Sequence, residues 1–163
     1  MSQPWEAWAA TYSTIVVEGC DGVGKTTLCD LLAARHCFPV IHSGRSPEGT
    51  DLVSRYHGIL AIAGKLVLDR SFVSELVYGP IFRDRSRLTL ADAVGLATAV
   101  AQRRGVLVHV RASPETIYER LNARGGNVWQ LSVIHQIQDQ YRRVFDRLAW
   151  HVPTALYDTD PAT

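Results

Sequence analysis

Residues 16–32 read VVEGCDGVGKTTLCDLL and establish what kind of fold the chain has. An apolar run ends at Glu18, a glycine-rich bend follows, and an apolar periodic segment begins after Lys25. Residues 19–26 match the pattern G-x-x-x-x-G-K-[ST] at every fixed position, between an expected strand and an expected helix. In that setting the backbone N–H groups of the bend and the positive end of the helix bind phosphate. The sequence therefore predicts a site for a nucleoside triphosphate.

Each residue of this loop has an expected part in binding ATP and Mg²⁺. Lys25 is expected to reach the outer phosphates, and the hydroxyl of Thr26 is expected to ligate Mg²⁺. Asp21 is either a turn-forming residue before Gly22 or an acid that approaches the acceptor. The residues expected to bind the cofactor are Gly19, Asp21, Gly22, Val23, Gly24, Lys25, Thr26 and Thr27.

Composition, charge and cysteine content limit the classes of protein to which the chain can belong. The chain has 163 residues, of which 47% are apolar and 20% are charged, so we expect residues 1–163 to form one soluble domain. The net charge of +1 gives no general attraction to nucleic acid, and no apolar run approaches the roughly 20 residues of a membrane span. Three cysteines without C-x-x-C spacing are typical of a reducing, cytoplasmic environment.

Short apolar segments alternate with helical ones along the chain, which predicts an α/β fold with a parallel sheet covered on both faces. Because ligands bind at the carboxyl ends of such strands, the loops after the strands should line the site. We expect strands at residues 14–18, 38–42, 65–69, 106–110 and 154–157, and helices at 26–36, 47–64, 71–78, 89–104, 113–124 and 133–148.

A second motif, LVLDRS at residues 66–71, is a strand that ends in an acid followed by an arginine. Asp69 is expected to hold Mg²⁺ through water, as the second acidic element of such sites does. Arg70 at the strand end could clamp the phosphate of an acceptor. The alternative is an acid at a helix start followed by a solvated arginine.

Four motifs resemble those of thymidylate kinases and occur in that family's order. They are VEGCDGVGKTT at 17–27, SGRSPEGT at 43–50, DRSFVS at 69–74 and the segment from Ser113 to Gly125. The resemblance implies the P-loop kinase fold, with five strands in the order 2-3-1-4-5 and a short lid at about residues 120–132. It also implies ATP- and Mg²⁺-dependent transfer of the γ-phosphoryl group to a deoxynucleoside monophosphate, with thymidylate as the default acceptor. The chain is shorter than is usual for the family. In this respect it resembles a bacteriophage enzyme, which would act in the host cytoplasm.

The resemblance also implies roles for residues outside the phosphate loop. Because Gly22-Val23 lacks the arginine of some relatives, Arg120 and Arg124 are the candidates to neutralise the donor phosphates, or else they form a solvated helix face. Tyr56 and Phe72 are either rings that stack on the acceptor base or core residues. The residues implied to bind the acceptor are Glu18, Asp21, Arg45, Arg55, Tyr56, Arg70, Phe72, Ser74 and Tyr78.

Two other functions remain open from the sequence. A deoxynucleoside kinase would need a base at the end of the first strand, where Glu18 is placed. A nucleotide-dependent switch is disfavoured because D-x-x-G after the third strand and N-K-x-D are absent. The apolar helix at 89–103 has two interpretations, a homodimer interface or a helix that covers the sheet.

Overall fold

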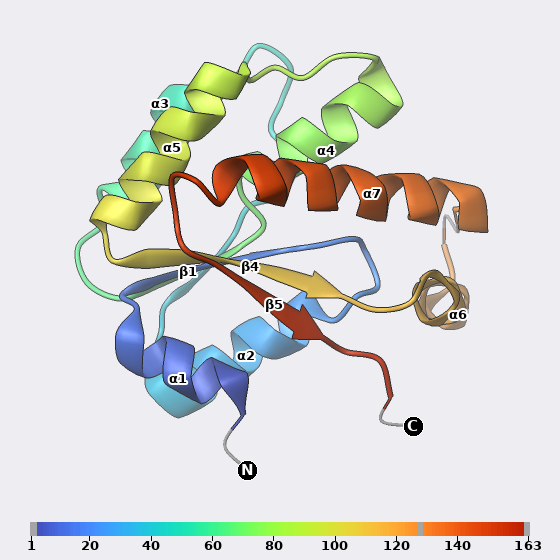
Figure 1. Cartoon of the computed structure of the whole chain (residues 1–163), viewed down its shortest axis with the longest axis horizontal. Coiled ribbons are helices and arrows are strands. Elements are labelled where there is room, and N and C mark those ends of the chain that lie inside the picture. The colour runs from blue at the N-terminus through green and yellow to red at the C-terminus, as the bar shows by residue number, and fades with distance from the viewer. Residues whose placement is uncertain (1–2, 127–128, 162–163) are drawn as a thin grey trace.

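Five parallel strands form the central sheet, in the order β2-β3-β1-β4-β5 (Figure 1). The computed structural model describes residues 3–126 and 129–161. The predicted α/β fold and the predicted strand order are therefore confirmed. The strands are β1 Thr14–Glu18, β2 Val40–His42, β3 Leu66–Asp69, β4 Gly105–Arg111 and β5 Thr154–Asp158.

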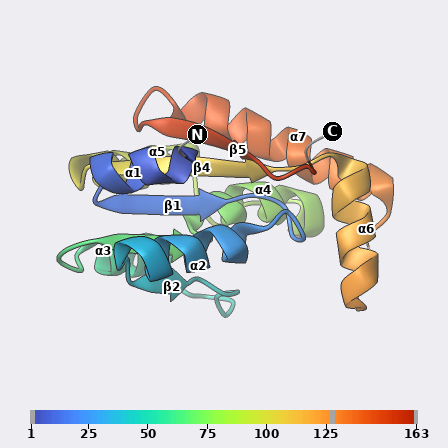
Figure 2. The ribbon, with the colours of Figure 1, turned by 90° about the horizontal axis from the view of Figure 1, so that it is seen from below.

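Helices cover both faces of the sheet. Figures 1 and 2 show α1 (Pro4–Thr11) and α2 (Lys25–His36) on one face. The opposite face carries α3 (Leu52–Leu60), α4 (Phe72–Arg83), α5 (Leu90–Gln102) and α7 (Leu131–Leu148). The remaining helix, α6 (Pro114–Arg124), stands at the end of the sheet to which β4 and β5 point. None of the helices described is long and apolar enough to cross a membrane.

The two central strands β1 and β3 are mostly apolar because helices bury both faces of the sheet. Every residue of β1 and β3 is buried, which is the pattern of central strands in a parallel sheet. The edge strand β5 instead alternates between exposed and half-buried residues. On α5, the apolar residues Ala93, Leu96, Ala97 and Val100 are buried within the chain, as expected of a helix that covers the sheet.

Two helices begin with a side chain that caps their first turn. Thr89 accepts a hydrogen bond from the backbone of Asp92, whose side chain accepts one from the Thr89 backbone, so the two residues form a capping box. Ser113 caps α6 by accepting from the Thr116 backbone, with Pro114 in the first turn.

The prediction that the helix starting at residue 71 ends at residue 78 is wrong, because α4 continues through Gly79 and Pro80 to Arg83. Pro80 cannot donate the hydrogen bond that the carbonyl of Leu76 would otherwise accept. The side chain of Gln140, on α7, donates to that carbonyl over 3.2 Å. A tertiary contact thus compensates for the bond that the proline removes.

Two further boundaries differ from expectation. The predicted helix at 47–64 shortens to Leu52–Leu60, because Asp51 accepts a hydrogen bond from the Ser54 backbone and so caps the helix at residue 51. The N-terminal segment, for which no helix is predicted, forms α1, and its Trp5 is buried in the core.

Replacing Gly79 with alanine should destabilise the fold, because a Cβ there would lie 2.7 Å from the carbonyl oxygen of Arg85 and 3.0 Å from the Cα of Ser86. Both neighbours are backbone atoms and must shift, so we expect the free energy of unfolding to fall by about 1–3 kcal/mol in urea denaturation. Gly95, in the middle of α5, has nothing within 4 Å of its Cβ position. Gly95→Ala should therefore raise stability by up to about 1 kcal/mol. Equal gains in both variants would contradict this packing.

Candidate active site

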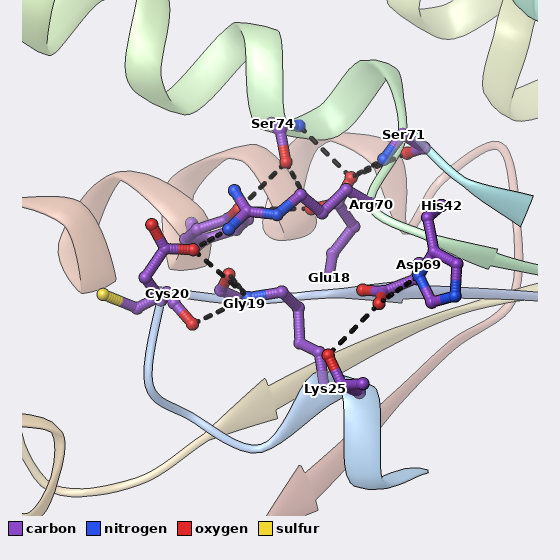
Figure 3. Close-up of polar contacts among 12 residues, drawn as sticks. Glu18, Gly19, Cys20, Lys25, His42, Asp69, Arg70, Ser71 and Ser74 are labelled. Carbon is purple, nitrogen blue, oxygen red and sulfur yellow. Dashed lines mark hydrogen bonds and ion pairs between the residues drawn. The ribbon is translucent and has the colours of Figure 1, made fainter. Parts of the chain in front are cut away.

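The ends of β1, β2 and β3 bring the two sequence motifs together at the carboxyl edge of the sheet (Figure 3). The loop after β1 requires glycine at three positions, since Gly19, Gly22 and Gly24 have φ angles of 153°, 82° and 100°. A Cβ at Gly19 would also collide with the carbonyl oxygen of Val110. The loop therefore packs tightly against the end of β4 while curling its backbone inward, as a phosphate-binding loop does.

Lys25 lies over this loop at the start of α2. Its ammonium group donates to the carbonyl oxygens of Gly19 and Cys20, each over 2.8 Å, and lies 3.8 Å from Asp21 Oδ1. The side chain is only 6% exposed. Burial lowers the pKa of Lys25, and the nearby Glu18 opposes that shift. The loop thus holds one cation at a fixed position.

Thr26 and Asp69 form a pair of oxygen groups beside Lys25. The Thr26 hydroxyl donates to Asp69 Oδ2 over 3.3 Å, and His42 Nδ1 lies 2.9 Å from the same oxygen. A hydroxyl next to a carboxylate suits Mg²⁺, which prefers oxygen ligands, so the residues present fit the expected metal. Sequence reasoning missed His42 at this site. Its place at the end of the strand paired with β3, opposite Asp69 in register, was the available signal.

Arg70 follows β3 in a left-handed backbone conformation, with a φ of 71°. This region is unfavourable for a residue with a side chain and is typical of functional sites. The guanidinium group forms an ion pair with Asp21, and it lies 6.0 Å from the ring centre of Tyr78. Arg70 therefore reaches back across the phosphate loop and places a second cation near Lys25.

Glu18, at the end of β1, is completely buried and is surrounded by donors (Figure 3). Its carboxyl group accepts hydrogen bonds from the backbone and hydroxyl groups of Ser71, at 2.6 and 2.8 Å, and of Ser74, at 3.3 and 2.8 Å. Tyr141, on α7, donates a fifth at 3.1 Å. Burial raises the pKa of Glu18, and the serine hydrogen bonds oppose that shift. Glu18 thus fixes the start of α4, immediately after Arg70.

The predicted acceptor residues in the loop after β2 and on α3 and α4 range from exposed to core positions. Arg45 is exposed, and Arg55 donates to Ser46 Oγ. Tyr56 and Phe72 are buried and meet edge to face at 6.0 Å, so they are core residues and not exposed stacking rings. Tyr56 also shares a 2.9 Å hydrogen bond with Ser43, at the end of β2.

Glu75 and Arg87 connect α4 to the loop after β2. Arg87 lies in a basic run, at residues 83–87, for which a solvated loop is the simplest expectation. Instead, its guanidinium group donates to Glu75 Oε2 over 3.0 Å and to the carbonyl oxygens of Ser46 and Pro47 over 3.3 and 3.1 Å. Arg83 donates to the other Glu75 oxygen over 2.6 Å. The loop that carries Arg45 is therefore held against α4.

Arg120 and Arg124, although on one helix, have different surroundings. Arg120 donates to the hydroxyl and carbonyl oxygens of Thr159 over 2.9 and 2.6 Å, and to the Val23 carbonyl over 3.4 Å. It therefore ties α6 to the phosphate loop and to the loop after β5, contacts that sequence reasoning did not foresee. Arg124 is exposed at the end of α6. Residues 127–128 of the expected lid lie outside the described residues.

Residues 15–130 match the model of the AAA domain family. The chain belongs to this family. The AAA domain is also similar to the SPbeta prophage-derived uncharacterized protein YorR of Bacillus subtilis (strain 168), with 28% identity over 148 residues. That alignment covers 89% of this chain and 88% of YorR.

Solved structures agree with the architecture of this AAA domain. YorR of Bacillus subtilis in complex with phosphorylated GDP superposes with a TM-score of 0.78 at 25% identity, over 89% of this chain and 85% of that one. Deoxyadenosine kinase from M. mycoides with bound dCTP gives 0.57 at 15% identity, covering 89% of both chains. A gluconokinase from Sinorhizobium meliloti 1021 gives 0.57 at 19% identity, over 91% and 83%. The AAA domain therefore has the P-loop fold seen in these kinases, and the resemblance to thymidylate kinases is borne out only at the level of this fold.

Proposed function

We propose that this protein transfers the γ-phosphoryl group of ATP to a deoxynucleoside monophosphate in a Mg²⁺-dependent reaction. We take thymidylate as the default acceptor. The observation that supports this most strongly is the position of Arg70. Arg70 follows β3, the strand next to β1, and reaches across the phosphate loop to form an ion pair with Asp21. It thus places a second cation near Lys25. A site with two cations suits two anionic substrates. A neutral acceptor would need only the cation that binds ATP, Lys25.

The proposed reaction forms a bond between an oxygen of the acceptor phosphate and the γ-phosphorus, and it breaks the bond to the oxygen that bridges the β- and γ-phosphates. ADP leaves, and the acceptor becomes a diphosphate. Such transfers depend on positioning and charge neutralisation more than on covalent chemistry. Lys25 contacts the transferred group, and Arg70 exchanges Asp21 for the acceptor phosphate. Thr26 and Asp69 would hold Mg²⁺, which when bound would neutralise charge on the donor phosphates. Asp21, once released, accepts a hydrogen bond from the 3′-hydroxyl of the acceptor sugar.

The surroundings of Glu18 argue against the alternative of a deoxynucleoside kinase. A general base must come within hydrogen-bonding distance of the hydroxyl that it deprotonates. Glu18 is completely buried, and its two oxygens already accept five hydrogen bonds. We therefore assign it the task of holding Ser71 and Ser74, and through them Arg70.

An acceptor panel tests this function. The protein is incubated with ATP, Mg²⁺ and each deoxynucleoside or its monophosphate, and release of ADP is followed. We expect turnover with monophosphates, fastest with thymidylate. Guanine nucleotides belong in the panel because the relative YorR is seen with phosphorylated GDP. Turnover with nucleosides alone, or ADP release without any acceptor, would overturn the proposal.

Arg124→Ala should reduce turnover much more than it reduces ATP affinity. The side chain is exposed at the end of α6, and we propose that it meets the donor phosphates only as charge develops during transfer. Losing such a contact lowers kcat by about 10²-fold while changing the Kd for ATP about twofold at most. Arg142→Ala, which removes an exposed arginine paired with Asp139 on α7, is the matched control and should leave both constants unchanged. Equal losses in kcat and ATP affinity would instead make Arg124 a ground-state contact.

A further inference from the structure

Three aromatic side chains, Tyr78, Phe82 and Trp129, form a cluster beside the proposed acceptor site. Tyr78 and Phe82 are four residues apart and therefore lie on one face of α4. Their rings stack at 6.0 Å with an interplanar angle of 12°. Trp129, just before α7, completes the aromatic cluster at 5.8 Å from Phe82 and 6.0 Å from Tyr78.

The aromatic cluster has a buried end and an exposed end. Tyr78 packs edge to face against the fully buried Tyr141, at 6.1 Å. Phe82, by contrast, is 49% exposed, and Trp129 is half-buried. Both rings thus present surface to solvent, although Trp129 also packs against the core. A protein gains little by leaving aromatic surface exposed, and grouped exposed rings mark binding sites.

The buried end of the aromatic cluster adjoins the cation proposed to bind the acceptor phosphate. The guanidinium of Arg70 lies 6.0 Å from the Tyr78 ring, on the way to its ion pair with Asp21. A path therefore leads from the phosphate loop through Arg70 and Tyr78 to Phe82 and Trp129. A mononucleotide has matching ends, with an anionic phosphate at one and a planar base at the other.

We propose that the base of the acceptor nucleotide stacks on Phe82 and Trp129 while Arg70 holds its phosphate. This rests on the proposed function and adds the residues that bind the base. Every base has a flat face, so stacking contributes affinity without choosing among bases. The aromatic cluster should therefore strengthen binding of all acceptors by similar factors. Discrimination between bases then falls to polar groups elsewhere in the site.

Tryptophan fluorescence provides a direct test. Titrating the protein, in the presence of ADP and Mg²⁺, with each deoxynucleoside monophosphate should change the emission of Trp129. The chain also contains Trp5, Trp8 and Trp150, so Trp129→Phe is needed to assign the signal. That variant should lose the fluorescence change yet keep acceptor binding by calorimetry within about threefold, because a phenylalanine ring still stacks.

Phe82→Ala should raise the Kd of each monophosphate about tenfold and leave the Kd of ATP unchanged. Because Phe82 is half exposed, its removal should leave thermal unfolding nearly unaltered, which circular dichroism would verify. Trp150→Ala is the matched control, since Trp150 is 88% exposed and outside the aromatic cluster, and its acceptor Kd should equal the wild-type value. Unchanged acceptor binding in Phe82→Ala would overturn the inference.

The outcomes also separate this inference from the proposed function. If the wild type binds and phosphorylates only nucleosides, the proposed function fails, and the Phe82→Ala titration with nucleosides still decides whether the base stacks on the aromatic cluster. If monophosphates are phosphorylated but Phe82→Ala binds them normally, only the stacking inference fails. If neither class of acceptor binds, both fail.

Discussion

Replacing Lys25 with alanine should lower kcat for the proposed transfer by about 10²- to 10³-fold, the largest loss expected from any single change. Lys25 is the cation held at the phosphate loop, with its ammonium 2.8 Å from the carbonyl oxygens of Gly19 and Cys20. We expect it to stabilise the charge on the transferred phosphoryl group, for which no other side chain of the loop is cationic. Steady-state kinetics with saturating ATP and acceptor would measure the loss.

Lys65→Ala is the matched control for this variant. Lys65 is the other lysine of the chain, and it lies on the surface with its ammonium 4.9 Å from the ring centre of Phe38. Its removal should leave kcat unchanged. Thermal unfolding of Lys25→Ala must be measured alongside, because the side chain is buried. A folded Lys25→Ala variant with near wild-type kcat would show that the loop does not act through this lysine.

Replacing Glu18 with alanine should have the second largest effect, on stability and on acceptor binding together. Five donors from Ser71, Ser74 and Tyr141 would lose their acceptor in a buried site. Each buried donor left unsatisfied costs about 1–3 kcal/mol, so we expect the free energy of unfolding to fall by about 3 kcal/mol or more. Urea denaturation would measure this. Arg70 would also lose the support that holds its left-handed backbone, so the KM for the acceptor should rise by at least about tenfold.

Glu18→Gln separates the two consequences. It keeps the size of the side chain and one carbonyl oxygen, so it should lose less stability than Glu18→Ala while still raising the acceptor KM. Glu119→Ala, which removes an exposed carboxylate from α6, should change neither quantity. A fully stable Glu18→Ala variant that retained the wild-type acceptor KM would refute the positioning role.

Local signals in the sequence were sufficient for most of the fold. The caps of α5 and α6 were predictable because Thr89 and Ser113 bond to residues three positions away. The continuation of α4 through Pro80 was not, because the bond that replaces the missing one comes from Gln140 on another helix. The buried ends of β1 and β3 were also visible, since their apolar runs stop at Glu18 and Asp69.

The candidate site likewise has parts that local sequence signals predict and parts that depend on contacts between distant segments. Residues 19–27 form a contiguous motif, so their loop could be located before its structure was known. The hydrogen bonds of Arg120 to Thr159 join distant segments that no pattern in the sequence pairs. The hydrogen bond of His42 to Asp69 could be inferred only by placing β2 beside β3 and aligning their ends. Phe82 and Trp129 come together in the same way, because α4 and the segment before α7 meet only in the folded chain.

The most direct test of the account is the ratio of kcat/KM for thymidylate to that for thymidine, with ATP and Mg²⁺, in the wild type and in Arg70→Ala. We expect the wild type to favour thymidylate by about 10²-fold or more, because Arg70 binds a phosphate that thymidine lacks. Arg70→Ala should lose most of that preference while its ATP affinity stays the same. A wild-type preference for thymidine, or an unchanged ratio in Arg70→Ala, would contradict the assignment of a two-anion site.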